Sequence, residues 1–271
     1  MRDRNDRADT GRAKPATAAR PTVPRGSLPA HTARLIIRDF TSRGLHPGDG
    51  LADEATLVER YGVSRATLRE ALRLLNFLGA VTVKAGPQGG PRLGMPGPAV
   101  VGSALGMVVQ FQGATLRTVF EARTAVESSV AALAAANRTD SDLALLEESV
   151  AALRATERKR GPGYAEHAAT WTLRVAEASH NSLLATVVPA LVAMNSTVPW
   201  RYPEGSRPRL TVGVTNVVEA IRDGNGDRAA AETREMIQWL IDELQAAQPE
   251  CLDHRIFWPE LDEILSQGIQ G

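Results

Sequence analysis

Cysteine is almost absent from this sequence of 271 residues, because Cys251 has no second cysteine with which to form an intramolecular disulfide. A disulfide scaffold is therefore excluded, and a reducing compartment is favoured. No uninterrupted apolar run approaches the ~18–20 residues that a membrane-spanning helix needs. The first residues also lack the apolar core of a secretory signal. We expect a cytoplasmic protein with no membrane partner.

Net charge is absent as well, since 31 basic and 31 acidic side chains cancel. The total hides an asymmetry along the chain. Residues 1–98 carry 16 basic and 9 acidic side chains, a balance of +7, whereas residues 99–271 carry 15 and 22, a balance of −7. A basic N-terminal part and an acidic C-terminal part favour two domains with different partners.

Apolar periodicity and glycine- or proline-rich breaks predict the organisation of the chain. The fold class that we expect is mostly α, with an N-terminal winged helix-turn-helix and a C-terminal all-α helical bundle. The expected parts are a disordered arm (1–27), a first domain that ends in the two-stranded ribbon (28–94), a linker with the first bundle helix (95–113), an all-helical second domain (114–247), and a C-terminal tail with a short helix starting at Pro259 (248–271).

The first domain is predicted from the order of its elements. Helical patterns over 29–43, 53–61 and 64–78 are followed by two short strands within 80–94 around a glycine-rich tip. The second and third helices are separated by the turn Tyr61-Gly62-Val63-Ser64, in which Gly62 permits a positive φ. Helix, helix, turn, helix and ribbon is the order of a winged helix-turn-helix.

The third predicted helix has two distinct faces. Leu68, Ala71, Leu72 and Leu75 follow core spacing, and Arg65, Arg69 and Arg73 fall at i, i+4 and i+8 on another face. Arginine donates two hydrogen bonds to guanine, and the hydroxyls of Ser64 and Thr67 suit phosphate or base. The alternative is a solvated arginine face paired with Glu70. Together with the turn and the ribbon, the pattern favours DNA reading.

The segment that carries these features closely resembles the DNA-binding domain of GntR-family transcriptional regulators over residues 30–94. It reads PGDGLADEATLVERYGVSRATLREALRLLNFLGAVTVKAGPQGG. By position, the resemblance implies DNA contacts from the recognition helix and the wing, namely from Ser64, Arg65, Thr67, Arg69 and Gly86, with Lys84 and Gln88 as weaker candidates. Many members have an arginine after the glutamate of the second helix, where this chain has Ala55, so operator preference should differ. The wing tip is also longer than usual.

Residues 114–247 resemble the all-helical effector domain (FCD) of the FadR-type subfamily. The resemblance is carried by LRTVFEARTAVESSVAALAAANRTDSDLALLEES, WTLRVAEASHNSLLATVVPAL and VVEAIRDGNGDRAAAETREMIQWL. Most such domains hold a metal ion through Asp-x3-His and two later histidines. The corresponding positions here are Ala168, Thr172, Val214 and Trp239. None of them suits a divalent ion, so we expect no metal and no other cofactor. We expect His167 and His180 to lie at the surface or beside the pocket without binding a metal.

Without a metal, the expected effector pocket is more apolar. We expect it to be lined by Arg123, Ala168, Thr172, Val214, Trp239 and Trp171. Arg123 occupies a position from which family members direct a cation at the effector, and its alternative role is an intrahelical pair with Glu127. Such a pocket suits an organic acid, an acyl-CoA or another amphipathic molecule. The loop 199–209 is either a lid that reads an anionic head group or a solvated loop anchored by Trp200.

The expected function is a ligand-responsive transcriptional regulator, with repression as the expected mode. It should bind a palindromic double-stranded DNA operator as a homodimer and respond to a small-molecule effector. The alternative is a constitutive DNA-binding protein whose C-terminal domain only dimerises. An enzyme is not expected, because no nucleophile–base arrangement, phosphate loop or metal quartet is found. Cys251 is expected to lie in a tail without a flanking helix or a basic partner.

Overall fold

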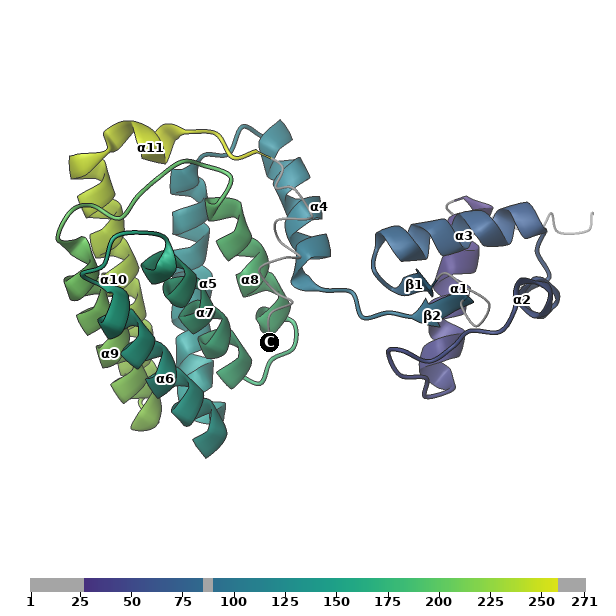
Figure 1. The fold of residues 1–271 in the computed structure, drawn as a ribbon, viewed down its shortest axis with the longest axis horizontal. Helices are drawn as coiled ribbons and strands as arrows, with labels where there is room; N and C mark the ends of the chain where they lie inside the picture. The colour runs from purple at the N-terminus through teal and green to yellow at the C-terminus, as the bar shows by residue number, and fades with distance from the viewer. Residues whose placement is uncertain (1–26, 85–89, 258–271) are drawn as a thin grey trace, which may run out of the picture. The chain divides into compact units, whose positions relative to one another are not determined.

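The computed structural model describes residues 27–84 and 90–257, and it divides the chain into two compact units, one up to Gly94 and one from Met95 (Figure 1). The expected arm, the wing-tip residues Gly86 and Gln88, and the expected helix from Pro259 lie outside the described residues. The described fold is mostly helical with a single two-stranded sheet, which confirms the predicted fold class.

The first unit is a winged helix-turn-helix. It consists of α1 (Leu28–Ser42), α2 (Glu54–Tyr61), α3 (Arg65–Phe77) and the antiparallel strands β1 (Val81–Lys84) and β2 (Gly90–Leu93). The strands pair in the register Val81↔Leu93 to Lys84↔Gly90. Ile36, Leu57 and Leu68 are fully buried and bring the three helices onto one core.

Local chemistry defines where α2 and α3 begin and end. The side chain of Asp53 accepts a hydrogen bond from the Thr56 amide at 2.9 Å, so it caps the start of α2. Gly62 ends that helix with φ 62°, a left-handed conformation that glycine adopts without strain. Ser64 then caps α3 by accepting from the Thr67 amide at 3.1 Å. The turn between the two helices therefore follows from the sequence.

The segment before α2 contributes to the wing, which the sequence did not predict. Residues 46–50 lie outside the helices and strands that the sequence predicted for this domain. The Gly48 amide donates to Leu93 O at 2.8 Å, the Leu51 amide donates to Pro91 O at 2.9 Å, and Gly50 forms an isolated bridge with Arg92. The chain from Gly48 to Leu51 thus lies along the outer edge of β2 and protects it.

Gly94, directly after β2, has no room for a side chain. Its amide donates to Ala80 O at 3.0 Å, and a Cβ added at this position would lie 2.2 Å from the backbone oxygen of Gly79. Because backbone must move to relieve that contact, we expect Gly94→Ala to destabilise the first unit by about 1–3 kcal/mol. Gly97→Ala is the matched control, since nothing lies within 4 Å of its Cβ position.

The four tryptophans all follow residue 170, so their fluorescence reports on the second unit alone. The loss caused by Gly94→Ala should therefore appear as an earlier circular-dichroism transition that tryptophan fluorescence does not follow. Equal unfolding curves for Gly94→Ala and Gly97→Ala would contradict the close packing of Gly94.

The second unit is a helical bundle. Its helices are α4 (Pro98–Phe111), α5 (Leu116–Asn137), α6 (Asp140–Thr156), α7 (Gly163–Ala178), α8 (Leu184–Asn195), α9 (Ser206–Arg222), α10 (Gly226–Ala247) and the short α11 (Pro249–Asp253). Helix α5 is central and packs against α7, α8, α9 and α10 (Figure 1). None of the helices described is long and apolar enough to span a bilayer.

The C-terminal end of the described chain belongs to this bundle, whereas the sequence pattern predicted that the bundle ends at residue 247. Leu252 and Ile256 are fully buried in its core. The Ile256 amide donates to Ala114 O at 2.9 Å, and the Leu116 amide donates to His254 O at 3.0 Å. This segment thus fastens onto the start of α5.

The expectation for Cys251 was wrong. The residue lies within α11 and is buried in the bundle core. Burial raises the pKa of its thiol, although the nearby charge of Arg117 acts in the opposite direction. Cys251 is therefore a packing residue with little thiolate at neutral pH.

Candidate DNA-reading surface and effector pocket

The first turn of α3 presents polar groups from a fixed position. The Ser64 hydroxyl caps the helix and lies 2.9 Å from the Thr67 hydroxyl. Arg65, the first helical residue, is exposed, and no described residue pairs with it. The turn therefore places one unpaired guanidinium beside two positioned hydroxyl groups.

The other two arginines of this face have intramolecular partners. Nε of Arg69 donates to both carboxylate oxygens of Glu54, at 3.0 and 3.2 Å, and so connects α3 to α2. The side chain of Arg69 nevertheless remains 67% exposed. Arg73 pairs with Glu70 at 3.4 Å. For Arg73, the structure therefore agrees with the alternative of a solvated arginine paired with Glu70. The contact between Arg69 and Glu54 was not predicted from the sequence.

The wing is described only at its base. Lys84 ends β1 opposite Gly90, and the expected contacts from Gly86 and Gln88 fall on residues outside the described part. Arg92 of β2 does not project freely, because its Nη1 donates to Gly48 O at 2.9 Å. Within the described residues, α3 is thus the main DNA-facing candidate.

In the second unit, Arg123 and Glu127 of α5 form a buried ion pair. Nε of Arg123 donates to Glu127 Oε1 at 2.6 Å and its Nη2 donates to Oε2 at 3.3 Å. Their side chains are 13% and 6% exposed. Burial by itself lowers the pKa of Arg123, but the Glu127 carboxylate outweighs it and the net pKa is raised. The intrahelical pair weighed as an alternative is therefore present.

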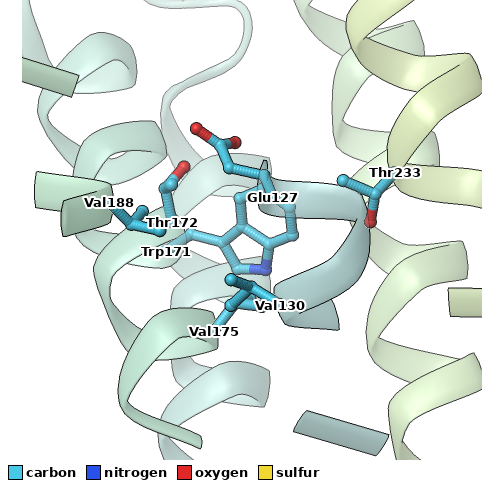
Figure 2. Close-up of a pocket in the computed structure, with 7 residues that line it drawn as sticks. All are labelled: Glu127, Val130, Trp171, Thr172, Val175, Val188 and Thr233. Carbon is cyan, nitrogen blue, oxygen red and sulfur yellow. The ribbon is translucent and has the colours of Figure 1, made fainter. Parts of the chain in front are cut away.

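Beside this pair lies a small cavity between α5, α7, α8 and α10. Figure 2 shows the ring of Trp171 at its centre, and the other lining residues are Glu127, Val130, Thr172, Val175, Val188 and Thr233. The space holds about one water molecule. The indole N–H of Trp171 is buried, and no described residue accepts a hydrogen bond from it. Two of the expected pocket residues, Trp171 and Thr172, thus line one cavity.

The structure does not bring all of the expected pocket residues together. Val214 is buried in the core and Ala168 is half-buried against it, but neither lines the cavity. Trp239 lies in a separate surface groove between α9 and α10, where the Arg209 guanidinium is 4.6 Å from its ring centroid. It is six residues after Thr233, a rotation of about 240° around α10, so it faces away from the cavity.

The chain between α8 and α9 is anchored by Trp200, as in the second of the two alternatives expected for it, and Pro199, Arg201 and Glu204 are exposed. Trp200 packs edge-on against Phe120 at 5.7 Å and against Tyr202 at 5.0 Å. Tyr202 in turn packs against Tyr164 at 5.1 Å. Burial raises the pKa of Tyr202, and the charges of Arg123 and Arg207 partly oppose that rise. This aromatic cluster, which joins α5, α7 and the 199–205 segment, was not predicted.

Two arginines assigned to the loop belong to α9, which begins at Ser206. The guanidinium of Arg207 lies 5.4 Å from the Tyr164 centroid and 5.8 Å from that of Tyr202, and its Nη1 donates to Lys159 O at 2.8 Å. Arg209 covers Trp239. Arg207 therefore packs against the aromatic cluster, whereas Arg209 belongs to the separate groove of Trp239.

A divalent metal ion does not fit this pocket. The positions that correspond to the ligands of related domains offer one buried hydroxyl, Thr172, and no carboxylate or imidazole. No group of three or more potential metal ligands occurs in residues 27–84 and 90–257. His180 lies near the surface, with its Nε2 2.8 Å from Asp142 Oδ2.

Comparisons with known proteins agree with this architecture. Residues 29–87 match the family described as bacterial regulatory proteins, gntR family, and residues 118–238 match the FCD domain. The chain belongs to the GntR family and carries an FCD domain. It is therefore a DNA-binding transcriptional regulator.

Individual relatives show the extent of the similarity. The HTH-type transcriptional regulator LutR of Bacillus subtilis is 29% identical over 194 residues, which are 69% of this chain and 87% of LutR. The regulator Mce2R of Mycobacterium tuberculosis is 39% identical over 64 residues, 24% of this chain and 27% of Mce2R. The solved structure of Streptococcus agalactiae GntR has a TM-score of 0.61 at 22% identity and covers 78% of this chain and 97% of its own, a likeness of fold.

Proposed function

We propose that this regulator is a homodimeric, effector-responsive repressor that reads a palindromic operator with the first turns of α3. The observation that carries the DNA-reading part is the exposed Arg65 beside Ser64 and Thr67 on a capped helix start. Arg69, oriented by Glu54, extends the same surface by one turn. Two such helices related by a two-fold axis match half-sites one DNA turn apart, about 34 Å.

The proposed effector site is the cavity around Trp171, next to the Arg123–Glu127 pair. Its unpaired indole N–H suits a hydrogen-bond acceptor, and the surrounding valines suit an apolar group. An organic acid or an acyl chain with a polar head has both features. Since the cavity has room for about one water, binding requires the side chains that line it to move. That movement would be the step that couples the effector to the DNA-binding unit.

One observation favours a second candidate, a constitutive DNA-binding protein whose bundle only dimerises. The charge of Arg123 is already neutralised by Glu127, and the cavity has no space for an organic ligand. This alternative differs from the first only in its response to small molecules.

Thermal melting separates the two candidates. The full chain is screened against organic acids, acyl-CoAs and divalent metals, and hits are retested by operator gel shift. We expect a concentration-dependent increase in the melting temperature with an organic ligand, a parallel loss of operator binding, and no effect of metals. Silence across the organic compounds would favour constitutive binding. About one equivalent of bound metal in elemental analysis would overturn the metal-free pocket.

A further inference from the structure

Helix α4 carries an apolar face that the described residues leave open. No charged residue occurs from residue 93 to residue 116, a stretch that includes the whole helix. Its inner side is built of small residues, so that a Cβ on Gly102 would lie 3.5 Å from Ala190 Cα of α8. On its outer side, Leu105, Val108 and Phe111 are 36%, 47% and 90% exposed. They follow one another at intervals of three and so share one face of the helix.

A contiguous apolar face of this kind marks an interaction site. Because α4 carries no charged residue, a partner cannot dock on it through ion pairs. The occupant must therefore bring an apolar stripe of its own.

The described chain ends beside this face. The Ile256 amide donates to Ala114 O, three residues after Phe111, and Arg255 forms a bridge with Thr115. Figure 1 shows the segment after α11 reaching the end of α4. Whatever follows Phe257 therefore starts within a few residues of the exposed side of Phe111.

The fourteen residues outside the described part, 258–271, have the required pattern. Leu261, Ile264 and Leu265 fall at i, i+3 and i+4 and share one face, with Glu263 on the opposite face and Glu260 and Asp262 at the flanks. Proline at 259 suits the first turn of a helix, and Gly268 suits its end. A helix over the ten residues 259–268 is about 15 Å long, against about 21 Å for the fourteen residues of α4.

We propose that residues 258–271 fold back along α4 as an amphipathic helix and cover Leu105, Val108 and Phe111. The direction is antiparallel, because the segment departs from the C-terminal end of α4. Tethering favours this occupant over a second copy of the chain, since the segment is held at a high effective concentration beside the face. The inference does not depend on the proposed operator or effector.

Disulfide trapping in the full chain tests the contact. In a Cys251→Ala background, Val108→Cys is combined with Leu265→Cys, which lies on the apolar side of the predicted helix. The matched control combines it with Glu263→Cys on the opposite side. We expect oxidation to give an intramolecular crosslink in most molecules of the first pair and in few of the second, read by thiol blocking and intact mass.

Each other outcome overturns the proposal. A disulfide-linked dimer from Val108→Cys alone would show that a second copy covers α4. No crosslink, or equal crosslinking of both pairs, would show that the segment lies elsewhere. As a second measurement, a chain ending at Phe257 should bind more of the dye ANS and melt several degrees lower. Unchanged dye binding and melting would also count against it.

Discussion

Replacement of Arg65 by alanine is expected to weaken operator binding by about tenfold or more per half-site, the 1–3 kcal/mol that a base-contacting arginine contributes. The guanidinium lies at the start of α3, is exposed and has no partner among the described residues. Its removal should therefore leave the fold intact. Gel shifts at several salt concentrations measure the loss. If Arg65 contacts a phosphate, the salt dependence should also become shallower, whereas a base contact relaxes the sequence preference.

Arg73→Ala is the matched control on the same helix. Arg73 lies about two turns after Arg65 on α3. It is highly exposed, and its guanidinium is paired with Glu70. Because it lies farther from the capped helix start, its removal should change the operator affinity little. Equal losses for Arg65→Ala and Arg73→Ala would indicate a diffuse electrostatic contribution, and an unchanged affinity of Arg65→Ala would disprove the proposed reading surface.

Replacement of Glu127 by glutamine is expected to lower the free energy of unfolding of the bundle by about 3–5 kcal/mol. The change keeps the size of the side chain but leaves the Arg123 guanidinium as a buried charge without a counter-ion. The tryptophans of the second unit report this transition, so urea unfolding followed by their fluorescence gives the loss directly.

Two further variants separate charge from packing. Glu121→Gln removes an exposed carboxylate from the same helix and should have almost no effect. The double variant Arg123→Met with Glu127→Leu removes both charges and should recover most of the stability. A double variant no more stable than Glu127→Gln would mean that shape, and not charge balance, accounts for the loss.

Much of the molecule could be predicted from the sequence because the relevant interactions are local. Asp53 and Ser64 each cap a helix by accepting a hydrogen bond from the amide three residues later. Gly62 adopts its left-handed conformation within the turn. Helical periodicity placed Leu68 and Leu75 in the core and Arg65 outside it.

Contacts between distant residues could not be predicted in the same way. The period of a helix shows which residues share a face, but it does not show which neighbouring element covers that face. The partner of Arg69 is Glu54, fifteen residues earlier, and the aromatic cluster joins Phe120, Tyr164 and Tyr202 from three separate segments. The packing of α11 likewise buried Cys251, which the sequence placed in a tail without a flanking helix.

The sequence by itself determined that the protein has a basic winged helix-turn-helix and an acidic, all-helical second domain, because composition, caps and periodicity are properties of short segments. Only the tertiary structure decided that Arg123 is neutralised by Glu127 in a nearly filled cavity and that Trp239 belongs to another surface. Burial and rotation around a helix axis depend on how whole helices pack against one another, and no single segment specifies that packing.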